Sequence, residues 1–145
     1  MYKKILVPLD GSELAKKALD HAEKLAEAFD AEIILFQVVP FMTMYGSPEL
    51  AMPLIVDDKQ KEAAEMYLTN LAEEIKIRGH KVTAMVKIGQ QVAVEIIEFA
   101  KKSGVDLIVM CTHGRSGITL WVLGSVAHKV LTRAETPILL IHLGR

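Results

Sequence analysis

The sequence alternates between short apolar runs and longer segments whose apolar residues recur with helical spacing. One run, 31–39, is apolar on both of its alternating faces, which is typical of a parallel-sheet strand covered by helices on both sides. This alternation predicts an α/β sandwich around a mainly parallel, five-stranded sheet. The expected strands are 5–7, 31–39, 82–87, 106–110 and 138–141, and the expected helices are 13–29, 59–78, 92–102 and 125–134.

Three details refine this expectation. The first apolar run stops at Pro8, so we expect the first strand to end there. In 82–87 apolar residues alternate with wetter positions, which predicts a strand near an edge of the sheet. The segment 40–58 contains three prolines and has no clean period, so it is expected to form a long loop. Loops of this length are typically functional or disordered.

Length and composition limit the function classes. A chain of 145 residues with 51% apolar residues suits one domain, spanning 1–145, with a sizeable core. The formal net charge is −1 and there is no basic run, so the charge pattern does not indicate nucleic-acid binding. No stretch reaches the roughly 18 apolar residues of a membrane span, and the N-terminal apolar run is too short for a signal peptide. The single cysteine, Cys111, cannot form an internal disulfide, so we expect a cytoplasmic protein without nucleic-acid or membrane partners.

The segment 109–126 passes from an apolar run through a glycine-containing loop into an expected helix. Glycines let main-chain N–H groups turn towards a ligand, and the first N–H groups of a helix lack intrahelical acceptors. The segment is therefore a candidate phosphate cradle. It matches neither the Walker A pattern nor the dinucleotide-binding glycine triple. From the residues alone, an ordinary loop with a helix cap at Ser125 is an equal alternative.

Polar, turn-forming residues follow two of the expected strands. Asp10 follows the first strand, and 111–125 follows the fourth. In parallel α/β sheets, ligands bind beyond the carboxyl ends of the strands, where the strand order reverses. If these two strands are neighbours at that point, both sets of residues face one crevice. Asp10 or Ser12 is also suited to cap the helix 13–29, and capping is compatible with a role in binding.

The other reactive side chains form no recognisable catalytic or metal-binding pattern. His113 has no evident carboxylate or serine partner, so a structural role in the loop is favoured over acid–base chemistry. Cys111 is interpreted as a small buried residue, because a reactive thiol needs an electropositive and accessible setting. Trp121 is expected in core packing or a dimer contact. The remaining histidines fall on separate elements without metal-ligand spacing.

Several motifs resemble those of the universal stress protein family in both order and spacing. The opening KILVPLDGS, the loop THGRSG and the later LGSVA carry much of the likeness. The resemblance covers nearly the whole chain except 40–58, and it implies a Rossmann-like, three-layer α/β/α sandwich of the adenine nucleotide alpha hydrolase-like type. The matching segments are 4–12, 106–110, 112–117, 123–127 and 136–139.

The ATP-binding branch of that family has a glycine, two residues, a second glycine, nine residues, and then glycine with serine or threonine. Gly114, the nine residues after it and the pair Gly124-Ser125 fit this spacing. Cys111 occupies the position of the first glycine, which is a departure from the pattern. Cysteine is small, so we expect nucleotide binding to survive this departure.

The resemblance also implies roles for individual residues in an adenine-nucleotide site. Asp10 and the main chain of Val38 would hold the adenine, and Arg115 is either a further positive charge at the phosphate end or a solvated loop residue. The ligand would be ATP, ADP or AMP, with Mg²⁺ or Mn²⁺ held through the phosphates. The residues implied to line the adenosine pocket are Pro8, Leu9, Met110 and Cys111, and those implied to receive the phosphates are Gly114, Gly124, Ser125 and Val126.

The implied function is that of a nucleotide-dependent regulatory or stress-response protein, which forms a homodimer through its last strand, 138–141. An apolar edge strand is a physically reasonable dimer surface. Two alternatives stay open. A slow ATPase or phosphotransferase would need a residue that positions water, and none is evident in the sequence. A dimeric interaction module that binds no nucleotide is the alternative that Cys111 favours.

Overall fold

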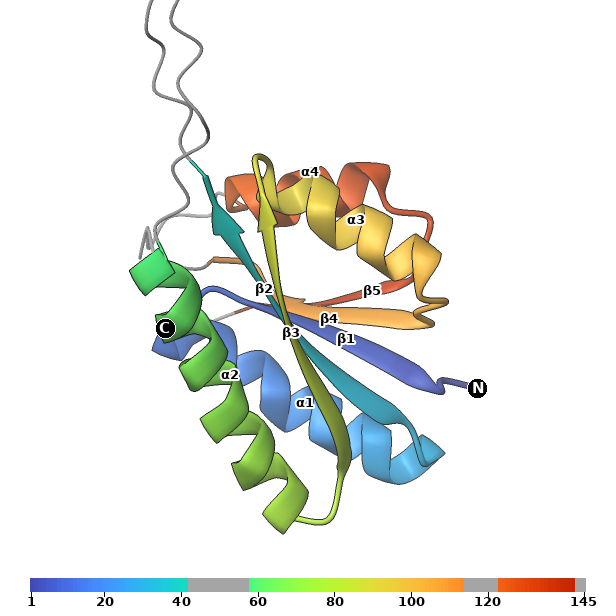
Figure 1. The fold of residues 1–145 in the computed structure, drawn as a ribbon. Coiled ribbons are helices and arrows are strands. Elements are labelled where there is room, and N and C mark those ends of the chain that lie inside the picture. Colours follow the sequence, from blue (N-terminus) through green and yellow to red (C-terminus); the bar gives the residue numbers. More distant parts are fainter. Residues whose placement is uncertain (42–57, 114–122, 143–145) are drawn as a thin grey trace, which may run out of the picture.

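The computed structural model describes residues 1–41, 58–113 and 123–142, which form alternating strands and helices (Figure 1). None of the helices among these residues is long and apolar enough to cross a lipid bilayer. Most of the expected loop 40–58 lies outside the described residues. The strands are β1 (Lys4–Leu9), β2 (Glu32–Pro40), β3 (Lys81–Gly89), β4 (Leu107–Cys111) and β5 (Ile138–Ile141), and the helices are α1 (Glu13–Phe29), α2 (Asp58–Ile77), α3 (Val92–Lys102) and α4 (Ser125–Arg133).

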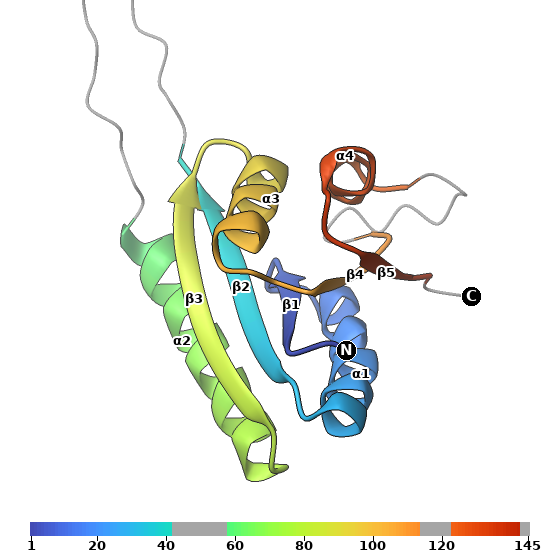
Figure 2. The same ribbon diagram turned by 90° about the vertical axis from the view of Figure 1, so that its right-hand side faces the viewer.

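The five strands form one sheet in the order β3-β2-β1-β4-β5, and every pairing is parallel. Helices α1 and α2 cover one face of the sheet, and α3 and α4 cover the other (Figures 1 and 2). The predicted three-layer α/β fold is therefore confirmed. The strand order reverses between β1 and β4, so the carboxyl ends of these two neighbours meet at the switch point of the sheet.

Alternation along the strands divides the core into two apolar clusters. Ile5 and Val7 of β1 pack in the cluster beneath α1 and α2, whereas Leu6 between them packs beneath α3 and α4. Strand β2 is buried on both faces, as the sequence predicted. In α2, the apolar residues that recur with helical spacing form the buried face, which consists of Ala64, Leu68, Leu71, Ala72 and Ile75.

The prediction that Pro8 ends the first strand is wrong, because β1 continues to Leu9. The reason lies in how β1 pairs with β4. The main-chain oxygen of Lys4 accepts a hydrogen bond from Asp106 N–H at 3.0 Å, so the main-chain groups of alternate residues, including Pro8, face β4. Pairing with β4 stops at Leu6 and Ile108. The N–H that proline lacks would therefore point to where β4 has already turned away.

The two edges of the sheet differ. Strand β3 lies at one edge, as predicted, and most of its residues are exposed. Strand β5 lies at the other edge, and all of its residues, Ile138–Ile141, are half-buried. The second edge is therefore the more apolar of the two, with Leu139 and Leu140 packing on opposite faces of the sheet.

Candidate functional site

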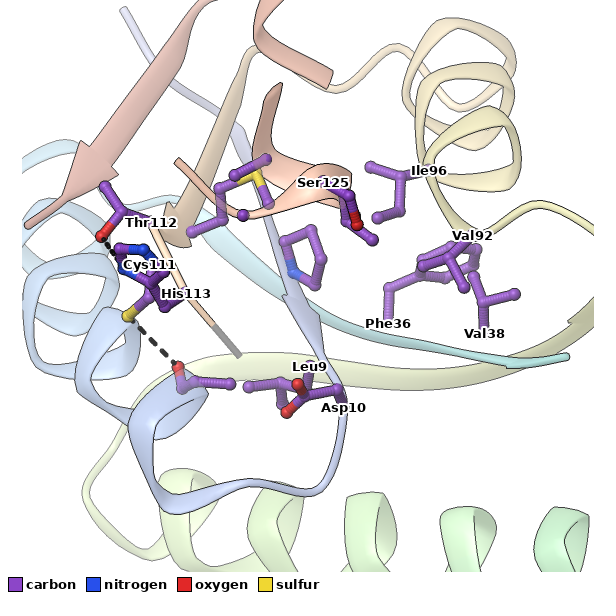
Figure 3. A pocket seen from close by; sticks show the side chains of 16 residues that line it. Leu9, Asp10, Phe36, Val38, Val92, Ile96, Cys111, Thr112, His113 and Ser125 are labelled. Carbon is purple, nitrogen blue, oxygen red and sulfur yellow. Dashed lines mark hydrogen bonds between the residues drawn. The ribbon is translucent and has the colours of Figure 1, made fainter. Parts of the chain in front are cut away.

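A cavity of about 250 Å³ opens where β1 and β4 diverge at the carboxyl end of the sheet (Figure 3). It is bounded by the ends of these strands, by α3 and by the first turn of α4. Crevices at this position of an open α/β sheet are where ligands bind. The lining residues are Pro8, Leu9, Asp10, Ala15, Phe36, Val38, Val92, Ile96, Met110, Cys111, Thr112, His113, Gly124, Ser125, Val126 and Ala127.

The β1 side of the cavity ends in a turn that fixes Asp10. One carboxylate oxygen of Asp10 accepts a hydrogen bond from Ser12 N–H at 2.9 Å, and the Ser12 hydroxyl caps α1 by accepting from Ala15 N–H at 3.2 Å. The predicted helix cap is thus Ser12, and Asp10 stabilises the turn that leads into it. This arrangement holds the Asp10 side chain at the wall of the cavity.

The wall on the α3 side is apolar. Phe36 and Val38 of β2 lie beside Val92 and Ile96 of α3 in Figure 3. Phe36 is fully buried and stacks on Phe99, with the ring centroids 4.5 Å apart. An apolar wall of this kind suits the face of an aromatic ring, which needs no hydrogen-bond partners there.

Cys111 faces α1. Its Sγ donates to the main-chain oxygen of Leu14 at 3.1 Å and lies 3.9 Å from the oxygen of Ala15, a contact drawn in Figure 3. Burial raises the pKa of the Cys111 thiol above its ordinary value, so the thiol stays protonated at neutral pH. The interpretation of Cys111 as a small buried residue is confirmed. The side chain connects the end of β4 to the first turn of α1.

The first turn of α4 forms the far end of the cavity. Gly124 precedes the helix, and its main-chain N–H donates to the oxygen of Thr112 at 2.9 Å. A Cβ on Gly124 would lie 2.9 Å from that same oxygen, so only glycine fits here without a shift. No side chain of the described residues caps α4, and the first N–H groups of a helix lack intrahelical acceptors. The partial positive charge of this helix end therefore faces the cavity.

Every predicted site residue that the structure describes lines this one cavity. Gly114, Arg115 and Trp121 lie outside the described residues. Sequence reasoning missed the α3 wall, because helical spacing in 92–102 indicates an inward face without showing what it faces. The predicted residues that line the cavity are Pro8, Leu9, Asp10, Val38, Met110, Cys111, Gly124, Ser125 and Val126.

Comparison with known proteins agrees with this architecture. The family model described as the universal stress protein family matches residues 1–142. The chain belongs to the universal stress protein family. One relative in this family, a universal stress protein of Methanocaldococcus jannaschii, is 36% identical over 141 residues, which are 97% of this chain and 82% of the relative. Universal stress protein YxiE of Bacillus subtilis is 34% identical over 149 residues, covering 97% of this chain and 99% of the relative.

Solved structures of universal stress proteins share the fold. The structure of MJ0577, a universal stress protein of Methanocaldococcus jannaschii, has a TM-score of 0.84 and 31% identity, and the match covers 100% of this chain and 99% of that one. A family member from Archaeoglobus fulgidus was solved with dAMP, with a TM-score of 0.70 and 20% identity over 96% of this chain and 97% of that one. One from Arabidopsis thaliana was solved with AMP, with a TM-score of 0.66 and 21% identity over 98% of this chain and 92% of that one.

Proposed function

We propose that this universal stress protein binds an adenine nucleotide, ATP or its products ADP and AMP, in the crevice between β1 and β4. The observation that carries the proposal is the cavity itself, which joins an apolar slot to an uncapped helix N-terminus. An apolar slot suits a purine ring, and a helix N-terminus suits phosphate. The AMP and dAMP complexes of proteins with the same fold support the same class of ligand.

The base end of the site is assigned to β1, β2 and α3. The adenine lies against the wall formed by Phe36, Val92 and Ile96. Asp10 accepts from the exocyclic amine, and the main chain of Val38 supplies the second polar contact. Pairing between β1 and β2 ends at Leu9 and Gln37, so the strand edge beside Val38 has no further neighbour in the β1 strand. Main-chain groups there are placed to read a base edge.

The phosphate end is assigned to the first turn of α4. The main-chain N–H groups of Ser125 and Val126, with the Ser125 hydroxyl, donate to phosphate oxygens. Gly124 keeps this turn close to Thr112, because any side chain would meet the Thr112 oxygen. No group of three or more acidic, histidine or cysteine side chains suited to a metal occurs among the described residues. We assign Mg²⁺ or Mn²⁺ to the phosphates of the ligand, because Mg²⁺ keeps several water ligands and is commonly held through substrate phosphates.

Cys111 is compatible with this assignment. Its thiol donates to the oxygen of Leu14 in α1, and the atoms nearest to a Cβ on Gly124 belong to Thr112 and His113. Cys111 stands where the ATP-binding branch has its first glycine, and its side chain is directed towards α1. Cys111 was the feature that favoured a module without nucleotide binding, and its orientation towards α1 weakens that alternative.

We further propose a regulatory homodimer formed by β5 of two copies. All four residues of β5 are half-buried, and one side of the strand lies at the open edge of the sheet. An apolar edge of this kind is stabilised when a second chain covers it. A twofold arrangement brings the same strand from each copy together.

Calorimetric titration with ATP, ADP and AMP, with and without Mg²⁺, tests the proposed binding. We expect saturable binding with one nucleotide per chain and loss of binding in Val92→Phe, which places a ring in the apolar slot. Ile97→Phe is the matched control, because Ile97 is a half-buried α3 residue outside this cavity. Chromatography of the ligand afterwards separates binding from hydrolysis. Absence of saturable binding with Mg²⁺ present would contradict the proposal.

A further inference from the structure

We propose that His113 is an additional ligand of the nucleotide phosphates and that Thr112 is the residue that positions it. This inference rests on the proposed nucleotide site and adds a side-chain contact at its phosphate end. His113 lines the cavity together with Gly124 and Ser125. The sequence alone favoured a purely structural role for this histidine, because no carboxylate or serine partner was evident. The structure supplies a partner of another type.

Thr112 is held from both sides by its main chain. Its N–H donates to the oxygen of Ile141 in β5 at 3.1 Å, and its oxygen accepts from Gly124 N–H at 2.9 Å. The residue is also buried, with 9% of its surface exposed. Its side chain therefore projects from a fixed point between the last strand and the start of α4. A group that is hydrogen-bonded to this side chain is therefore held in place as well.

The bonded group is the imidazole of His113. The Thr112 hydroxyl oxygen lies 3.1 Å from His113 Nδ1, and Figure 3 shows this contact at the wall of the cavity. The backbone of His113 is close to the helix start as well, since its Cα would lie 3.7 Å from a Cβ on Gly124. The main chain of His113 thus lies next to the start of α4, where the phosphates are assigned, and the imidazole is tethered to Thr112 at the wall of the same cavity.

We take the Thr112 hydroxyl as the donor in its contact with His113 Nδ1. When the Thr112 hydroxyl donates to Nδ1, the ring proton of neutral histidine resides on Nε2. In the nucleotide complex we assign Nδ1 to Thr112 and Nε2–H as the donor to a phosphate oxygen. A hydrogen bond to a charged oxygen is about twice as strong as a hydrogen bond between neutral groups. The main-chain donors of α4 and the imidazole then contact the phosphates from two directions.

This assignment makes a specific demand on the ligand. The contribution of His113 requires a phosphate, so it appears with ATP and AMP and is absent with adenosine. A structural role in the loop would instead change the affinity of all three ligands together. Comparing the three ligands therefore distinguishes the two roles without any assumption about stability.

Calorimetry on the full chain with ATP, AMP and adenosine is the first test. We expect His113→Ala to weaken ATP binding by about tenfold or more and to leave adenosine affinity within about twofold. His113→Gln, whose amide nitrogen can occupy the place of Nε2, should retain more ATP affinity than His113→Asn, which mimics Nδ1. Equal losses for ATP and adenosine, or no loss for ATP, would overturn the assignment.

Thr112 is tested by removing only its hydroxyl. Thr112→Val keeps the shape of the side chain, and Thr112→Ser keeps the hydroxyl, so the two form a matched pair. We expect Thr112→Val to weaken ATP binding, Thr112→Ser to retain it, and Thr112→Val to add little in a chain that already carries His113→Ala. Additive losses would show that Thr112 does not act through His113.

Nuclear magnetic resonance of the imidazole nitrogens distinguishes a ligand contact from a structural role, because only a ligand contact shifts the Nε2 signal when nucleotide is added. We expect His113 in the Nε2–H tautomer and a shift of its Nε2 signal on addition of ATP but not of adenosine. The Nδ1–H tautomer, or an Nε2 signal unchanged by ATP, would overturn the proposal. If the unsubstituted chain binds none of the ligands, the proposed function itself fails, which is distinguishable from ATP binding that is indifferent to His113.

Discussion

Gly124 and Thr112 meet through their main chains at the mouth of the cavity. The Gly124 N–H donates to the Thr112 oxygen at 2.9 Å, and a Cβ on residue 124 would lie 2.9 Å from the same oxygen. The φ angle of Gly124 is −58°, so the glycine is required here by space and not by a left-handed backbone. The contact sets the distance between the end of β4 and the first turn of α4.

Substitution of this glycine should therefore damage the phosphate end of the site. We expect Gly124→Ala to destabilise the fold by about 1–3 kcal/mol, because the Thr112 carbonyl has to move, and to weaken ATP binding at least tenfold. Gly124→Val should abolish binding. Thermal denaturation and calorimetry measure the two effects. Gly104→Ala serves as the control, since Gly104 has a φ of +64° with nothing within 4 Å of an added Cβ and lies outside the cavity. It should lower stability and leave ATP affinity unchanged.

Substitution of Cys111 should change the stability of the fold much more than the affinity for ATP. Cys111→Gly restores the glycine of the family pattern but removes a buried side chain and its bond to Leu14. We expect a loss of about 1–2 kcal/mol of stability with ATP affinity changed by less than about threefold. Chemical denaturation and calorimetry provide the two values. A large gain in ATP affinity would show that the thiol obstructs the ligand after all.

The same thiol should be unreactive in the folded protein. Burial raises its pKa, so the thiolate that attacks an alkylating reagent is scarce at neutral pH. We expect iodoacetamide to label Cys111 rapidly only after denaturation, as followed by mass spectrometry. Rapid labelling of the folded chain would show that the end of β4 opens readily to solvent.

Tyr67 predicts how stability depends on alkaline pH. Its hydroxyl has no hydrogen-bond partner among the residues that the structure describes, and burial, with the charges of Glu13 and Asp10, raises its pKa from 10.0 to about 12. A raised pKa contributes stability that is complete below pH 10 and is lost as the pH rises towards 12, because the unfolded chain ionises first. Tyr67→Phe should reduce this loss. At neutral pH the substitution should be neutral or stabilising by up to about 1 kcal/mol, since it removes an unpaired buried group.

The measurement for Tyr67 is urea denaturation at a series of pH values from neutral to alkaline. The titration of the tyrosine hydroxyl can be followed in parallel through the ultraviolet absorbance of tyrosinate. A clear destabilisation of Tyr67→Phe at neutral pH would contradict the prediction, because it would reveal that the hydroxyl has a partner in solution.

The edge of β5 predicts which residue controls dimerisation. The oxygens of Pro137 and Ile141 accept hydrogen bonds from Ile108 and Thr112 of the β4 segment, so the main chain of alternate residues faces β4. By this alternation Leu140 directs its N–H to the open edge. We expect Leu140→Pro to fold and to be a monomer in sedimentation, and we expect the unsubstituted chain to be a dimer.

Leu139→Pro is the matched control for the edge. Its N–H faces β4, so proline at this position removes a bond within the sheet and should lower stability by about 1–3 kcal/mol. A dimer that survives Leu140→Pro would move the interface away from the main chain of β5.

Local periodicity was sufficient to predict the elements themselves. Helix α1 runs over Glu13–Phe29 as expected, and the apolar face of α2 is the buried one, because a helix interior is read from spacing within a few turns. The helix expected from residue 125 is present as α4, but the cap suggested at Ser125 is wrong, because Gly124 is the N-cap and Ser125 is the first helical residue. The end of β1 was predicted wrongly at Pro8, because local rules could not show that pairing with β4 stops before this residue.

The site depends on distances that no local pattern contains. Only the tertiary structure placed β1 beside β4, ended their pairing at Leu6 and Ile108, and brought the α3 residue Ile96 to the same cavity as Asp10. It also turned the Cys111 thiol to α1 and brought Thr112 against both Gly124 and Ile141. These relationships arise when apolar faces from distant segments are buried together, and the sequence determines that burial only through the whole chain at once. The sequence by itself therefore determined which residues have the chemistry for a nucleotide site, and packing decided that they share one cavity.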